Sequence, residues 1–273
     1  MDYLNYGKKV QQQTQTQPQK PQPQGFGNQV QLTKNDFSFG DLKQQTIQQQ
    51  AEFPIESDEL MQLFPIPLLI CPYPFDYSKE LEWIKKQECR NENKTEENVK
   101  RGSKYPLQNL NRQSKDTFIL DKPEMSRIRK FIEVKLKEFV SNVMGSDSEM
   151  VITQSWLNKN GKGESHHDHK HPNSMVSGVW YPLIHEKLPR IQFRIGQQRD
   201  VSFSIKRWNH FNNSSFMLPM KAGELIIFPS NLMHGVPANL CDEERISLSF
   251  NTWIKGNLGN ERDLTYLPLD RCV

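Results

Sequence analysis

The sequence contains no long hydrophobic run. Nowhere do its 273 residues approach the ~20 consecutive apolar residues that a membrane-spanning helix requires. The opening residues, 1–6, also lack the apolar segment of a secretory signal peptide. From these two absences we expect a cytoplasmic protein with no membrane partner.

Paired cysteines are missing as well. The four cysteines are scattered and form no CxxC pair, which argues against a disulfide framework or a zinc ribbon and favours a reducing compartment. An excess of one charge is also absent, because the net charge is only +3. The composition therefore gives no indication of a nucleic-acid partner or of an acidic membrane surface.

Hydrophobic residues are scarce. They make up 35% of the chain, and the mean hydropathy is −0.75, which predicts that part of the chain does not fold. Residues 8–50 are rich in Gln, Pro, Lys and Asn. Such a segment cannot bury enough apolar area to offset its chain entropy, so we predict that residues 1–55 form a disordered Gln/Pro-rich tail.

Ordered structure is predicted to begin near Leu60, with a helical part over residues 75–145. Before it, residues 63–71 are apolar, and their prolines suit an edge strand. Residues 77–89 have the periodicity of an amphipathic helix. A clearer helix opens with Asp121 as its predicted N-cap and ends at Gly145.

A β-rich core is predicted over residues 150–255. Short apolar or alternating segments are separated by turn residues, a pattern typical of a sandwich or barrel. The fold class is therefore mainly β with N-terminal helices. The predicted strands are 150–157, 175–181, 190–195, 201–205, 225–228 and 245–251.

Histidines are concentrated at one point of the β core. Four of the seven lie within residues 166–171, in the run His-His-Asp-His-Lys-His. In an extended chain the odd-numbered histidines share one face, and His166 and Asp168 share the other. Imidazole and carboxylate groups both bind transition metals, so the ligand pair is either His169 with His171 or His166 with Asp168. A solvent-exposed loop with adventitious metal affinity is the alternative.

A single histidine and a strand arginine follow further along the chain. His234 comes after the strand 225–228 and a turn, and Arg245 begins the next strand. An arginine that enters an apolar strand needs an anion opposite it. An ion pair with Glu243 is the structural alternative. The order of histidine pair, distal histidine and strand arginine is more specific than any one of these features.

Together these segments resemble the 2-oxoglutarate- and Fe(II)-dependent oxygenase family. The similarity is to a branch with an HxHP motif followed by SGVxY, which bacteriophages often encode. It covers about residues 60–254 and leaves out the Gln-rich tail. The matching runs are Ser155–Asn158, His169–Ser174, Ser177–Tyr181, Gly223–Ser230 with His234, and Arg245–Asn251.

The resemblance implies a double-stranded β-helix, the jelly-roll core of the cupin-like oxygenases, with the N-terminal helices packed outside it. One oxygenase-like domain would span residues 60–255, and a C-terminal extension would span residues 256–273. If a phage encodes the chain, the expected location is the cytoplasm of the host cell.

By position, the resemblance implies that His169, His171 and His234 are the metal ligands. The usual site of such oxygenases holds two histidines and one carboxylate, so Asp168 is an alternative ligand. No catalytic residue is predicted beyond the ligands.

The resemblance also implies a pocket for 2-oxoglutarate. Arg245 matches the arginine that receives the far carboxylate of this acid, since an arginine can bind a carboxylate through two hydrogen bonds. Ser247 faces the same way as Arg245. Asn158 and Tyr181 are further candidates for the pocket, with ordinary sheet positions as the alternative.

The implied function is that of a dioxygenase that uses Fe(II), O2 and 2-oxoglutarate. It would hydroxylate a substrate that the sequence does not identify and release succinate and CO2. Two other hypotheses stay open at this point. One is a non-catalytic metal-binding cupin-like module, and the other is an interaction protein whose tail recruits a partner.

Overall fold

The computed structural model describes residues 65–90, 111–195, 204–209 and 211–269. They lie in the compact unit Leu63–Val273. The predicted tail, residues 1–55, lies outside the described residues, as does most of the predicted strand 201–205. No helix in the described part of the chain is long and apolar enough to cross a membrane.

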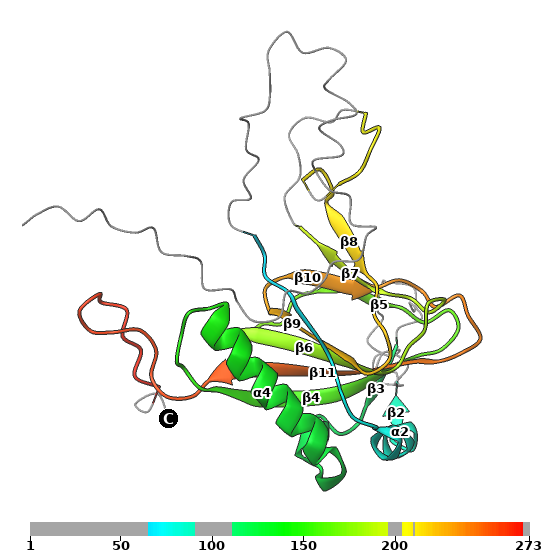
Figure 1. The fold of residues 1–273 in the computed structure, drawn as a ribbon, viewed down its shortest axis with the longest axis horizontal. Coiled ribbons are helices and arrows are strands. Elements are labelled where there is room, and N and C mark those ends of the chain that lie inside the picture. Colours follow the sequence, from blue (N-terminus) through cyan, green and yellow to red (C-terminus); the bar gives the residue numbers. More distant parts are fainter. Residues whose placement is uncertain (1–64, 91–110, 196–203, 210, 270–273) are drawn as a thin grey trace, which may run out of the picture. The chain divides into compact units, whose positions relative to one another are not determined.

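Two antiparallel sheets form the core (Figure 1). The large sheet has the strand order β1-β9-β6-β11-β4-β3-β2, and the small sheet has the order β5-β10-β7-β8. The strands of the large sheet are β1 (Leu69–Pro72), β2 (Cys89–Arg90), β3 (Arg112–Ser114), β4 (Met150–Asn160), β6 (Val176–Leu183), β9 (Glu224–Pro229) and β11 (Arg245–Ile254). Those of the small sheet are β5 (His166–His169), β7 (Ile191–Arg194), β8 (Ser215–Leu218) and β10 (Met233–Val236).

The connections between these strands define the fold. From β4 to β11 the chain alternates between the sheets, except that β7 and β8 are consecutive strands of the small sheet. In the large sheet β11 lies between β4 and β6, and in the small sheet β10 lies between β5 and β7. This is the connectivity of a jelly roll. The predicted double-stranded β-helix is therefore confirmed.

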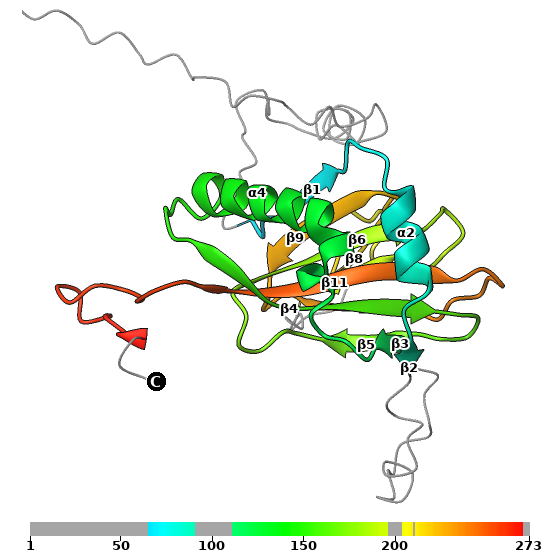
Figure 2. The same cartoon turned by 90° about the horizontal axis from the view of Figure 1, so that it is seen from below.

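Two helices cover the outer face of the large sheet, on the side away from the small sheet (Figures 1 and 2). They are α2 (Ser78–Lys85) and α4 (Ser126–Asn142), and the 3-10 turns η2 (Ile119–Asp121) and η3 (Pro123–Met125) precede α4. Helix α4 places an apolar residue every three or four positions on one face, and these side chains are fully buried in the cluster beneath the sheet. They are Ile128, Ile132, Leu136 and Phe139.

Strand alternation separates two hydrophobic clusters. On β6, Trp180 joins the cluster on the helix side, whereas Val179 and Tyr181 join the cluster between the sheets. On β9, Ile227 and Phe228 are divided in the same way. Because both faces of the large sheet are covered, polar side chains on its inner face are removed from bulk water.

Three sequence predictions need correction. Asp121 is not an N-cap, because it lies in η2, its carboxylate pairs with Arg129, and α4 begins five residues later without a side-chain cap. The short strands β2, β3, β8 and β10 were not predicted: β2 and β3 fall in the predicted helical part, and none of the four has more than four residues. Strand β4 extends to Asn160, three residues beyond the predicted end, where pairing with β11 and β3 holds it.

Candidate active site

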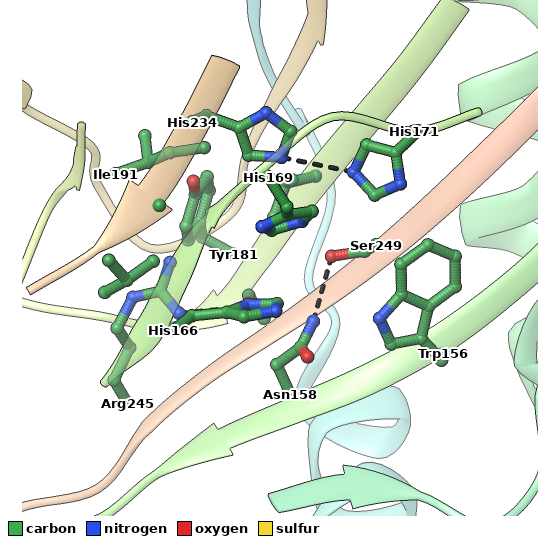
Figure 3. A pocket seen from close by; sticks show the side chains of 14 residues that line it. Trp156, Asn158, His166, His169, His171, Tyr181, Ile191, His234, Arg245 and Ser249 are labelled. Atoms are coloured by element: carbon green, nitrogen blue, oxygen red, sulfur yellow. Dashed lines mark hydrogen bonds between the residues drawn. The ribbon is translucent and has the colours of Figure 1, made fainter. Parts of the chain in front are cut away.

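A narrow cavity lies between the two sheets (Figure 3). Its inner wall is the face of the large sheet that points toward the small one, and its outer wall is the small sheet. Imidazole, amide, hydroxyl and guanidinium groups are interspersed with apolar side chains. The lining residues are Trp156, Asn158, His166, His169, His171, Val179, Tyr181, Ile191, His234, Gly235, Val236, Arg245, Ser247 and Ser249.

Three of the predicted residues converge at the cavity wall. His169, His171 and His234 each offer one ring nitrogen, and these atoms lie within 4.8 Å of one another. Pairing of β5 with β10 sets His169 opposite His234. His171 follows the end of β5, and its backbone N–H donates to the carbonyl of Ser230 at 3.0 Å. Long-range pairing thus brings a local histidine pair to a histidine 63 positions away from its second member.

Backbone carbonyls fix the tautomers of two of these rings. Nδ1 of His169 lies 2.8 Å from the carbonyl of His167, and Nδ1 of His234 lies 2.8 Å from that of Leu232. A carbonyl oxygen only accepts, so each ring carries its proton on Nδ1 and keeps a lone pair on Nε2. Nε2 of His171 lies 3.1 Å from Nε2 of His234 and donates to it.

The three imidazoles are neutral at neutral pH. Burial lowers the pKa of His171 to about 3 and that of His234 to about 4, and repulsion from neighbouring imidazoles acts in the same direction. The pKa of His169 is lowered for the same main reason. A histidine binds a metal ion through its neutral form, so burial keeps these three side chains in the form that a metal needs.

The rest of the histidine run does not keep strict alternation. His166 enters the cavity and stacks on His169 with 4.4 Å between ring centroids, whereas His167 is exposed. The prediction that His167 shares a face with His169 and His171 is therefore wrong. The physical reason is that β5 ends at His169, and its pairing with β10 is irregular between His234 and Val236.

Asp168 points away from the three histidines. Its Oδ2 accepts from Arg194 Nε at 2.8 Å, and its Oδ1 lies over the backbone of Gly235. The structure thus brings His169 and His171 toward His234, and the carboxylate of the His166–Asp168 pair to an arginine on β7.

At the other end of the cavity Arg245 is 2% exposed and has no carboxylate partner among the described residues. Its Nη1 donates to Asn160 Oδ1 at 3.2 Å and to Ser247 Oγ at 3.1 Å. The guanidinium carbon lies 5.2 Å from the ring centroid of Tyr181. The ion pair with Glu243 is not formed. Burial lowers the pKa of Arg245, as expected for a cation that no anion compensates.

Several buried polar atoms near this cavity have no hydrogen-bond partner within the described part of the chain. They are Trp156 Nε1, Asn160 Nδ2, Tyr181 Oη and Arg245 Nε. All four can donate a hydrogen bond. A buried donor without a partner lowers stability, and such groups in a native structure call for a ligand or ordered water. The cavity is therefore suited to a ligand that carries acceptors, above all carboxylate oxygens.

The other predicted pocket residues have protein partners. Asn158 accepts from Asn111 Nδ2 at 2.8 Å and donates to Ser249 Oγ at 3.0 Å. Ser247 accepts from Arg245 and so orients the guanidinium. Both line the cavity, but their polar groups are engaged within the protein. Tyr181 differs, because its hydroxyl proton has no acceptor among the described residues. Burial raises its pKa to about 12 despite the neighbouring Arg245, which keeps the proton available for donation.

Several polar residues of the site were not predicted from the sequence. His166 was considered only as a partner of Asp168. Trp156, which lines the cavity, and Asn160, which accepts from Arg245, were not considered. A signal was present, because Trp156, Asn158 and Asn160 are two residues apart on one strand and must share a face.

Residues 154–251 match a family model described as "Putative 2OG-Fe(II) oxygenase". This segment contains every residue that lines the cavity. The search of curated proteins found no match.

Three solved structures are similar to the chain at low identity. An oxidoreductase of the 2OG-Fe(II) oxygenase family from Burkholderia pseudomallei is 13% identical, with a TM-score of 0.44, over 68% of this chain and 83% of that one. HygX from Streptomyces hygroscopicus, with nickel, 2-oxoglutarate and hygromycin B bound, is 14% identical, with a TM-score of 0.45, over 68% and 82%. A prolyl-4-hydroxylase from Pseudomonas putida is 12% identical, with a TM-score of 0.44, over 70% and 94%. No substrate is carried over from these structures to this chain.

Proposed function

Residues 154–251 of this chain belong to the 2OG-Fe(II) oxygenase family, and from this premise we propose that the chain is a 2-oxoglutarate-dependent dioxygenase that hydroxylates its substrate. In this proposal His169, His171 and His234 hold Fe(II), and Arg245 binds the far carboxylate of 2-oxoglutarate. The observation that carries the proposal is the buried guanidinium, which has no carboxylate partner in the described part of the chain, in the same cavity as three neutral imidazoles.

The residues fit the metal. Imidazole nitrogen suits iron, and the lone pairs on Nε2 of His169 and His234 are available because Nδ1 of each ring is held by a carbonyl. The Nε2 proton that His171 now donates to His234 would have to move to Nδ1 for all three rings to bind. Asp168 stays outside this ligand set, held by Arg194.

The residues also fit the acid. Arg245 Nε and Tyr181 Oη are donors at one end of the cavity that find no acceptor among the described residues, and Asn160 and Ser247 hold the guanidinium in place. A carboxylate bound there would give the buried arginine its missing negative charge. Val179, Ile191 and Val236 contribute apolar surface to the same cavity.

When bound, Fe(II) supplies the site at which O2 and the 2-oxo acid react. The overall reaction takes R–H, O2 and 2-oxoglutarate to R–OH, succinate and CO2. The task of this chain is to hold the acid by its far carboxylate and to keep the cavity dry. The imidazoles remain neutral because burial lowers their pKa.

The test has two parts. Formation of succinate from 2-oxoglutarate is measured with Fe(II) in air, and binding of 2-oxoglutarate to the Fe(II)-loaded protein is measured by calorimetry without oxygen. We expect succinate in the wild type, loss of both metal and activity in His234→Ala, and retained metal with greatly weakened acid binding in Arg245→Gln. Asp168→Ala is the matched control, and it should keep metal binding if the ligands are the three histidines.

An iron-loaded protein that neither binds nor converts 2-oxoglutarate would contradict the proposal. It would favour the non-catalytic metal-binding module, which requires the histidines but gives Arg245 no anion to bind.

A further inference from the structure

The indole N–H of Trp156 is a buried donor that the proposed function does not use. Trp156 Nε1 has no hydrogen-bond partner within the described residues, and the side chain lines the cavity. The indole of Trp180, which is fully buried in the core, donates to the carbonyl of Gly223 at 3.1 Å. The described residues thus supply an acceptor for one indole N–H and none for the other, which lies beside the candidate metal centre.

The strand register places Trp156 at the opposite end of the cavity from Arg245. On β4 and β11 the inward-facing pairs are Asn160 with Arg245, then Asn158 with Ser247, then Trp156 with Ser249. Trp156 and Arg245 are therefore separated by four residues along paired strands, roughly 14 Å at ~3.4 Å per residue. Free donors stand at both ends of this row.

The Trp156 end is the end at the histidines. The indole lies beside His171, with 5.7 Å between ring centroids. In Figure 3 the indole nitrogen is on the side of the ring that faces Asn158 and Ser249, toward the interior of the cavity. A group bound at His171 and directed into the cavity would come within reach of this N–H.

We propose that the indole N–H of Trp156 donates a hydrogen bond to the carboxylate next to the keto group of 2-oxoglutarate, at the metal end of the cavity. This inference rests on the proposed function. A linear diacid needs donors at both of its ends, and the cavity supplies Arg245 and Tyr181 at one and Trp156 at the other. In this proposal the ligand provides the acceptor that the described residues do not offer to this donor.

The test is Trp156→Phe, which removes the N–H and retains an aromatic ring against His171. Binding of 2-oxoglutarate to the Mn(II)-loaded full-length protein is measured by calorimetry, and Mn(II) affinity is measured separately. We expect the Kd for 2-oxoglutarate to rise on the order of tenfold or more, which corresponds to the loss of one hydrogen bond to a charged group. The Mn(II) affinity should stay unchanged.

A second readout separates this role from a structural one. Removing an unsatisfied buried donor should leave the stability of the ligand-free protein unchanged or higher. The matched control, Trp180→Phe, loses a protein hydrogen bond and should lower stability without changing the affinity for 2-oxoglutarate. If Trp156→Phe destabilises the protein as Trp180→Phe does and leaves binding intact, the inference is wrong.

A double variant, Trp156→Phe with Tyr181→Phe, tests whether the two donors bind different carboxylates of 2-oxoglutarate. If the two donors bind different carboxylates, the fold-changes of the single variants multiply in the double variant. Strong coupling would place both donors on one carboxylate and overturn the assignment. A wild-type protein that does not bind 2-oxoglutarate would instead refute the proposed function, so the two failures are distinguishable.

Discussion

At the scale of single residues, the proposed metal ligands carry no charge. Three neutral imidazoles would leave the two positive charges of Fe(II) uncompensated by the protein, whereas a site with two histidines and one carboxylate removes one of them. The one carboxylate of the histidine run, that of Asp168, is paired with Arg194. In this arrangement the anionic end of 2-oxoglutarate contributes the negative charge beside the metal. Acid binding should therefore depend strongly on the presence of metal.

Gly178 shows how close packing on the inner strands restricts the sequence. A Cβ built at this position would overlap the ring of Phe250 and lie 2.7 Å from the carbonyl of Ile226. We predict that Gly178→Ala lowers the free energy of unfolding by about 1–3 kcal/mol, as overpacking of a core does, as measured by denaturant titration.

The control for this prediction is Gly161→Ala. There the new methyl group would come 3.2 Å from Arg112 Nη2, the end of a long side chain that can move. Its stability should stay close to that of the wild type. Equal stability of the two variants would show that Phe250 and β9 adjust freely, contrary to the packing argument.

At the scale of elements, a hydroxyl network joins the segment after β5 to the turn before β10. Ser230 Oγ lies 2.7 Å from both Ser174 Oγ and Ser177 Oγ, and Ser177 donates to Asn251 Oδ1 at 2.8 Å. Beside it, the backbone N–H of His171 donates to the carbonyl of Ser230. The network therefore fixes the position of one proposed ligand relative to the strand that carries another.

We predict that Ser230→Ala weakens metal binding by roughly tenfold, the low end of the range for groups that orient metal ligands. The loss follows because the segment that carries His171 is held less firmly. Competition with a chelator of known affinity measures it. Ser230→Ala should keep its secondary structure, since the backbone hydrogen bonds remain.

The control for this variant is Ser114→Ala. Ser114 is also buried, and its hydroxyl donates to the carbonyl of Asp116 and accepts from Leu157 N–H. Ser114 lies on β3, outside the set of residues that line the cavity. Its loss should reduce stability but not metal affinity. If both variants changed the metal affinity equally, Ser230 would contribute only to the stability of the fold and not to the position of His171.

At the scale of the whole molecule, every residue that lines the cavity lies between Trp156 and Ser249. We predict that removal of residues 1–55 leaves the affinity for 2-oxoglutarate and the rate of succinate formation unchanged. Both are measured against the full-length chain, with His234→Ala as the inactive reference. A loss of 2-oxoglutarate binding on truncation would contradict this prediction and show that the N-terminal segment contributes to the site.

The sequence by itself determined the fold class and the main chemical groups of the candidate site. Short apolar or alternating segments between turn residues predicted six strand segments, because a strand buries one or both of its faces. Five of these segments overlap described strands, and the sixth, residues 201–205, lies mostly outside the described residues. Spacing left two candidate ligand pairs in the histidine run, His169 with His171 or His166 with Asp168. The family resemblance selected the first pair, together with His234 and Arg245.

Only the tertiary structure decided which side chains of the histidine run face the cavity. Asp168 and His166 belong to a four-residue strand, and its irregular pairing with β10 sends one to Arg194 and the other onto His169. Likewise, the free donors of Trp156 and Tyr181 are visible only once every neighbouring acceptor has been placed. Whether a polar group is satisfied depends on contacts between residues far apart in the chain, which no local pattern contains.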